Sequence, residues 1–155
     1  MSAEPEITIW ISAACTGSPG YGGWAWVALG GPEIKGQAGG DRRTTVQAMA
    51  AGAVTAALQG AAGSAPVLIR SESAYLVEGV ARPPFDDQPG WLKAAALVQA
   101  RAGPVRAELS KRVVGQKGAF TFVDAWAAFA QEKVKTTGAF AAPIPKSNLR
   151  NFLSS

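Results

Sequence analysis

Residues 8–26, TIWISAACTGSPGYGGWAW, decide the fold of this chain. Isoleucines alternate with other residues over 7–12, a period of two that is typical of a strand with one buried face. The Gly- and Pro-rich run at 17–23 interrupts the pattern, and WAWVAL at 24–29 predicts a second strand. The glycines resemble the floor of an enzyme site, yet the first strand ends in residues that neither bind metals well nor accept protons at neutral pH: Ser12, Ala13 and Ala14.

The composition limits the chemistry available to the chain. A length of 155 residues, 48% of them hydrophobic, predicts one domain that buries its own core. There is no apolar run of about 18 residues and no signal-like N-terminus, so we expect a cytoplasmic protein. Cys15 is the one cysteine and histidine is absent, which excludes an internal disulfide, a structural zinc site and a Ser/His or Cys/His nucleophile pair. Any catalysis must use carboxylates.

The net charge of +4 is unevenly distributed. Up to Gly90, five Lys and Arg residues stand against eight Asp and Glu residues, a balance of −3, whereas ten stand against three from Trp91 onward, a balance of +7. A basic half favours an acidic partner such as a nucleic-acid backbone, although a solvated basic face is nearly as common.

The remaining pattern predicts an α/β domain with elements in the order β-β-β-α-β-α-α-β-α. Residues 33–40 predict a third strand, and Thr44 and Gln47, at capping-box spacing, open an alanine-rich helix that ends near Gly60. Further strands are expected at 65–71 and 104–114, and helices at 72–80, 91–103 and 119–134. Phe122, Trp126 and Phe129 have helical spacing and are expected to form the core face of the last helix.

The end of the chain has a different composition. Residues 135–155 mix Pro, Gly, Ser and Lys and predict an irregular or flexible tail. We therefore expect a domain at 1–134 followed by this tail.

This order of elements, together with four aligned segments, resembles type 1 ribonuclease H, which cuts the RNA strand of RNA–DNA hybrids. The resemblance runs from about Ile7 to Lys133. Residues 42–58, 68–80 and 112–118 match three family segments in the right order. In the opening stretch the matching residues are Cys15, Gly17, Pro19, Gly20, Gly22, Gly23 and Trp24. The resemblance implies a five-stranded mixed sheet with helices on both faces.

Enzymes of that family hold two magnesium ions with four carboxylates. The resemblance places Ser12, Ala50, Glu72 and Asp124 at those positions, and Gln116 at the position of the family's loop histidine. It therefore implies no catalytic residues, no metal site and no cofactor, with Glu72 and Asp124 as weak metal candidates if residual magnesium- or manganese-dependent activity survives. Either acid can instead serve a helix N-terminus, and Glu72 can also pair with Arg70.

The resemblance also implies a surface that contacts nucleic acid. Where some of these enzymes carry a basic handle, this chain has Asp86 and Asp87. Gln47 has either a contact role or a capping role, and Cys15 is more often a small packed residue than a reactive thiol. The expected nucleic-acid-binding residues are Cys15, Ser18, Arg42, Arg43, Gln47, Lys111, Arg112 and Lys117.

From these observations we expect a catalytically inactive ribonuclease H-like protein that binds an RNA–DNA hybrid or another duplex. One alternative is a protein-interaction or self-association module, in which the sheet face near Trp10, Trp24 and Trp26 contacts a partner or a second copy. The other is a weak residual nuclease that uses Glu72, Asp124 and one ion. No membrane partner is expected.

Overall fold

The computed structural model describes residues 5–17, 19–31, 33–82, 88–110 and 118–153. These ranges contain one mixed sheet with strand order β5-β4-β1-β2-β3-β6. The strands are β1 (Ile7–Cys15), β2 (Gly20–Leu29), β3 (Lys35–Thr44), β4 (Val67–Ser71), β5 (Val105–Leu109) and β6 (Phe140–Pro143). The helices are α1 (Val46–Gly60), α2 (Ala74–Ala81), α3 (Pro89–Ala100), α4 (Ala119–Thr137) and α5 (Lys146–Leu153).

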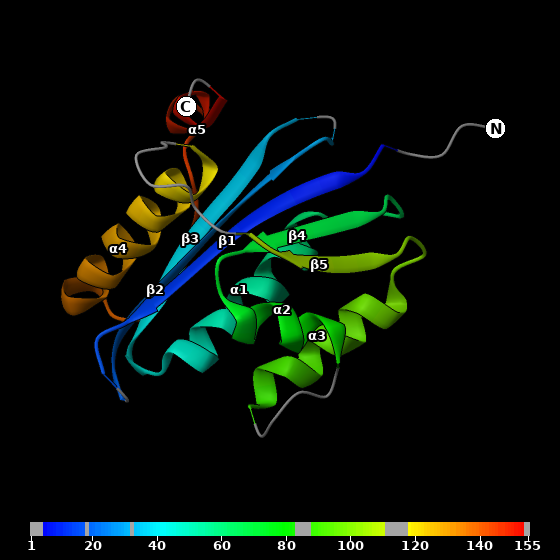
Figure 1. Ribbon diagram of the computed structural model, residues 1–155. Helices are drawn as coiled ribbons and strands as arrows, with labels where there is room; N and C mark the ends of the chain where they lie inside the picture. The colour runs from blue at the N-terminus through cyan, green and yellow to red at the C-terminus, as the bar shows by residue number, and fades with distance from the viewer. Residues whose placement is uncertain (1–4, 18, 32, 83–87, 111–117, 154–155) are drawn as a thin grey trace.

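Helices cover both faces of the sheet. Helices α1, α2 and α3 pack on one face, while α4 and α5 lie on the other (Figure 1). The predicted α/β arrangement is confirmed, but the sheet has six strands rather than five. No helix in the described ranges is both long and apolar enough to cross a membrane.

Strand β1 lies inside the sheet and contributes to both cores. It pairs antiparallel with β2 and parallel with β4. Ile9 and Ile11 are buried against α1, whereas the ring of Trp10 lies on the other face, 5.2 Å from that of Phe152. Burying an isoleucine contributes about 1.5–3 kcal/mol, so the alternation read from the sequence stabilises this strand on its α1 face.

Strands β1 and β2 run further than the sequence predicts, because Gly22 and Gly23 are strand residues. They pair with Cys15 and Ala14, respectively. A Cβ atom at Gly23 would collide with the carbonyl oxygen of Ala127 and lie 2.6 Å from the backbone nitrogen of Gln131. The glycine therefore allows α4 to pack directly on the sheet backbone.

The core face of α4 differs from the predicted one. Small residues face the sheet and are fully buried: Val123, Ala127, Ala130 and Val134. Phe122 and Trp126 are half-buried, and Phe129 is 52% exposed. The predicted core helix is confirmed, and Phe122 and Trp126 pack against the margin of its core, but the prediction was wrong for Phe129. The backbones of α4 and β2 approach too closely for aromatic rings to fit between them.

The N-cap of helix α1 lies one residue later than predicted. Thr45 is the N-cap and its hydroxyl accepts a hydrogen bond from the amide of Ala48 at 3.1 Å. Thr44 instead ends β3 and is buried. The predicted Thr44 and Gln47 capping box is therefore wrong, and Gln47 is an exposed residue in the first turn of α1.

The tryptophan surface considered for a partner is not available. Trp24 and Trp26 are buried under α1, and Trp10 is half-buried against Phe152. The indole of Trp26 fits because Gly60 has no side chain, and its Nε1 donates to Gln37 Oε1 at 3.1 Å. These rings stabilise the core and do not present a docking face.

The predicted irregular tail is structured. Helix α4 continues to Thr137, β6 pairs antiparallel with β3, and α5 follows. Ile144, Leu149 and Phe152 are buried in the same core as α4. The prediction failed because Pro and Gly dominate the local pattern, while the stabilising apolar contacts are made with residues far away in the sequence.

Replacing Gly23 with alanine tests the close approach of α4. We expect Gly23→Ala to lower the free energy of unfolding by about 1–3 kcal/mol or more, because the added methyl group pushes α4 away from β2. Urea unfolding followed by circular dichroism measures the change.

Gly52→Ala is the matched control, since no atom lies within 4 Å of its would-be Cβ. It should stabilise α1 by about 0.5–1 kcal/mol. Equal effects of the two substitutions would contradict the packing described for Gly23.

Truncating Leu149 tests whether α5 is docked. The side chain is 2% exposed, so Leu149→Ala should cost about 2 kcal/mol, the low end for buried leucines because the site lies at the edge of the core. Ser147→Ala, at an exposed position of the same helix, should change stability by less than about 0.5 kcal/mol in the same urea titration. A Leu149→Ala protein as stable as the parent would mean that the helix is undocked in solution.

Candidate functional site

Ser12 and Asp124 are predicted site residues that meet directly. Ser12 lies half-buried on β1, and Asp124 lies five residues after the start of α4. The Ser12 hydroxyl donates a hydrogen bond to Asp124 Oδ1 at 2.5 Å. Because the influence of a helix N-terminus fades after the first turn, Asp124 does not serve as a helix N-terminal acid.

Glu72 lies toward the same end of the parallel strands β1 and β4 as Ser12. Strands β1 and β4 are parallel with Trp10 opposite Arg70, and Ser12 and Glu72 each follow two residues later. Glu72 is exposed, immediately before Ser73, the N-cap of α2. The guanidinium of Arg70, considered above as a partner of Glu72, forms an ion pair with Glu108 at 3.6 Å.

Ala50, another of the expected metal-ligand positions, is buried. Its side chain is 3% exposed within the core between α1 and the sheet. A methyl group offers no oxygen to a metal, and this one is enclosed by apolar neighbours. Gln116, at the position of the family's loop histidine, lies outside the described residues.

These residues do not fit a centre of two magnesium ions. Across the described ranges, no three Asp, Glu or Cys side chains are grouped closely enough to hold a metal. Two divalent cations about 4 Å apart repel by roughly 17 kcal/mol at an effective dielectric of 20. Glu72 and Asp124 supply two negative charges against four positive ones, and magnesium demands a nearly complete octahedron of oxygens.

The predicted nucleic-acid-binding residues that the structure describes gather at one end of the molecule. Gly20 pairs with Thr44, so the hairpin between β1 and β2 lies beside the junction of β3 and α1 (Figure 1). Arg42 and Arg43 are exposed at this end of β3, and Gln47 is exposed just beyond it. The predicted residues outside the described ranges are Ser18, Lys111, Arg112 and Lys117.

Cys15 is part of this end but is not a reactive thiol. Its Sγ donates to the carbonyl oxygens of Gly17 at 3.1 Å and Thr44 at 3.4 Å. Burial raises the pKa of the thiol above its ordinary value, so the thiolate is a minor form at neutral pH. The packed role weighed in the sequence analysis is the one that this geometry supports.

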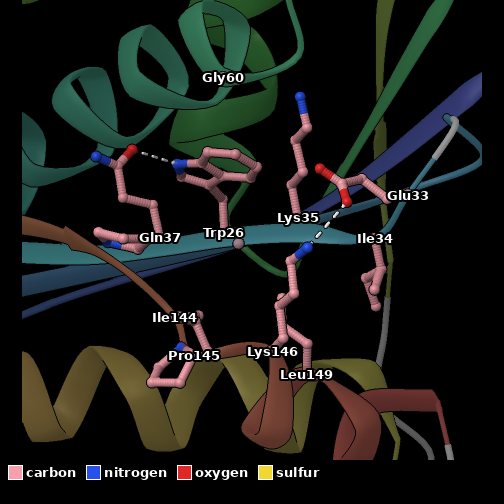
Figure 2. A pocket seen from close by; sticks show the side chains of 12 residues that line it. Trp26, Glu33, Ile34, Lys35, Gln37, Gly60, Ile144, Pro145, Lys146 and Leu149 are labelled. Carbon is pink, nitrogen blue, oxygen red and sulfur yellow. Dashed lines mark hydrogen bonds and ion pairs between the residues drawn. The ribbon is translucent and has the colours of Figure 1, made fainter.

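A hollow of about 510 Å³ lies away from all of these residues. Figure 2 shows Trp26, Lys35 and Gln37 on one side of the β3 edge and Ile144, Pro145 and Leu149 on the other. The ammonium of Lys146 pairs with Glu33 at 3.2 Å beside it. The sequence pattern does not predict this hollow, because five of its twelve lining residues come from the segment that was predicted to be irregular.

The α/β sheet with this strand order and a helix carrying Asp124 opposite β1 defines the ribonuclease H-like class of folds. The family model described as RNase H matches residues 4–134. The chain belongs to the RNase H family.

Curated relatives carry the name ribonuclease H. The chain is 35% identical to one from Cupriavidus necator over 101 residues, which are 65% of this chain and 66% of that protein. It is 34% identical to one from Chlorobium phaeovibrioides over 90 residues, 58% of this chain and 57% of that protein. The matched part thus spans less than two thirds of the length of these relatives.

Solved structures show the same fold at lower identity. The N-terminal RNase H domain of Rv2228c from Mycobacterium tuberculosis superimposes with a TM-score of 0.71 at 18% identity, covering 86% of this chain and 98% of the other. LC11-RNase H1, solved in complex with an RNA/DNA hybrid, gives a TM-score of 0.67 at 17% identity, covering 84% and 99%.

The hydrogen bond between Ser12 and Asp124 can be measured by a double-mutant cycle. We expect a coupling free energy of about 1–2 kcal/mol between Ser12→Ala and Asp124→Asn, because a partly buried hydroxyl donates to a carboxylate. Urea unfolding of the parent, both single variants and the double variant gives this value. A coupling below about 0.3 kcal/mol would contradict the contact.

Proposed function

We propose that this protein binds an RNA–DNA hybrid, or another nucleic-acid duplex, without cleaving it efficiently. Membership of the RNase H family supports a nucleic-acid partner, as does the hybrid bound by the structural neighbour LC11-RNase H1. The exposed residues Arg42, Arg43 and Gln47 support a duplex contact at the end of the molecule where the β1 and β2 hairpin meets α1.

The hydrogen bond from Ser12 to Asp124 carries the proposal of inefficient cleavage. The resemblance places the neutral hydroxyl of Ser12 where the family has a carboxylate, and this hydroxyl donates a hydrogen bond to the Asp124 carboxylate. Because this hydroxyl is neutral, it adds no negative charge that could offset the charge of a second cation. Ala50 is buried and apolar and adds no charge, so Glu72 and Asp124 are the two expected metal-ligand positions that carry a negative charge.

A weak metal-dependent nuclease is the second candidate. The observation in its favour is that Asp124 contacts Ser12 on β1, while Glu72 directly follows β4, the parallel neighbour of β1. Two carboxylates suit one weakly held ion at most, since magnesium retains its waters and needs several oxygen ligands.

Binding and cleavage should be measured on the same labelled RNA–DNA hybrid. We expect salt-sensitive binding in EDTA, because neutralising phosphates releases counterions, and no cleavage at ordinary rates in magnesium or manganese. The double substitution Arg42→Glu and Arg43→Glu should weaken binding at least about tenfold and flatten the salt dependence.

Lys35→Glu is the matched control, because Lys35 is an exposed cation at the opposite end of the same strand, about 23 Å from Arg42. The affinity of this variant for the hybrid should be within about twofold of that of the parent. Cleavage that disappears in the Glu72→Ala variant would instead establish the second candidate, and a hybrid that does not bind at low salt would refute the proposal.

A further inference from the structure

Aromatic side chains and a lysine gather on the flank of α4 that lies toward β3 and β6. We define the aromatic patch as Trp126, Phe129, Lys133 and Phe140. The rings of Trp126 and Phe129 have centroids 5.4 Å apart and meet edge to face. Phe129 is 52% exposed, so at least one of these rings offers a surface to solvent.

The patch contains a hollow that suits one flat ring. A space of about 210 Å³ lies between Trp126 and Phe129 on one side and Phe140 and Pro143 on the other. This volume is below the roughly 300 Å³ at which pockets for larger ligands begin, so it accommodates a single planar group. A shallower hollow beside Trp126 and Phe129 continues it along α4.

The charge at the patch is positive. The Lys133 ammonium lies 5.8 Å from the centroid of the Phe129 ring and 5.0 Å from that of Phe140. No carboxylate of a described residue forms an ion pair with it. Aromatic rings beside a cation suit a ligand that combines flat π surfaces with negative charge, as single-stranded nucleic acid does.

The patch is continuous with the proposed duplex-binding end. Phe140 of the patch pairs with Gly40, two residues before Arg42 on β3. A Cβ atom placed at Gly138, directly after α4, would lie 3.9 Å from Cδ of Arg42. A strand leaving a duplex held at Arg42 therefore meets the aromatic rings and Lys133 along α4.

We propose that the aromatic patch binds unpaired bases of a single strand that extends from the bound duplex. This inference rests on the proposed duplex binding. A base stacks on Phe129 and Trp126, and Lys133 contacts a neighbouring phosphate. The protein would then prefer junctions between duplex and single strand over blunt duplexes.

Fluorescence anisotropy in EDTA should compare a blunt RNA–DNA hybrid with the same hybrid carrying a short thymidine overhang on either strand. We expect an overhang to tighten binding by about fivefold or more, the effect of stacking one base. Phe129→Ala and Trp126→Ala should remove this gain and leave blunt-hybrid affinity within about twofold. For the overhang probe alone, Lys133→Gln should reduce the magnitude of the slope of log K against log salt concentration by about 0.7.

Leu92→Ala is the matched control, since Leu92 is a 61% exposed apolar residue on α3, across the sheet from α4. It should preserve the overhang gain, and circular dichroism should show that every variant is folded. Blunt binding without any gain from an overhang would overturn this inference and leave the proposed function intact. Absence of all binding would overturn both.

A protein partner for the same patch gives a different result. Sedimentation of the parent and of Phe129→Ala would then show a dimer that dissociates, with no overhang effect in the parent. That outcome would also overturn the inference and assign the aromatic patch to self-association.

Discussion

The close approach of α4 to the sheet is the constraint on which the rest of the structure depends. Gly23 leaves no side chain under the Ala127 carbonyl, and small residues on α4 complete the contact. Dispersion stabilises such a contact only when the backbones are this near, since a gap of less than about one ångström removes much of the attraction. The helix therefore has one permitted position over β1 and β2.

That position determines the chemistry on two sides of the helix. On the sheet side it brings Asp124 against the Ser12 hydroxyl, where the carboxylate is satisfied by a neutral donor. On the flank toward β3 and β6, Trp126 packs against the margin of the core, while Phe129 remains exposed beside Lys133. The contact between Ser12 and Asp124 and the exposure of Phe129 thus follow from the same packing.

The C-terminal segment completes the face that α4 leaves open. Strand β6 extends the sheet beside β3, and Leu149 and Phe152 cover apolar surface next to Trp10. The ring of Phe152 lies 5.4 Å from that of Phe122, which helps to bury one end of the α4 flank while Phe129 at the other end stays exposed. The segment therefore limits how far the exposed aromatic surface extends.

The sequence by itself determined the order of the elements as far as α4 and the buried face of β1, because alternation, helical period and turn residues are local signals. The candidate positions at Ser12, Glu72 and Asp124 came from the resemblance of its motifs to those of ribonuclease H. Tertiary structure alone decided that Gly22 and Gly23 are strand residues, that Phe129 is exposed, that residues 140–153 contain a strand and a helix, and that Ser12 bonds to Asp124. Each of these depends on the distance between backbones far apart in the chain, and no local pattern encodes that distance.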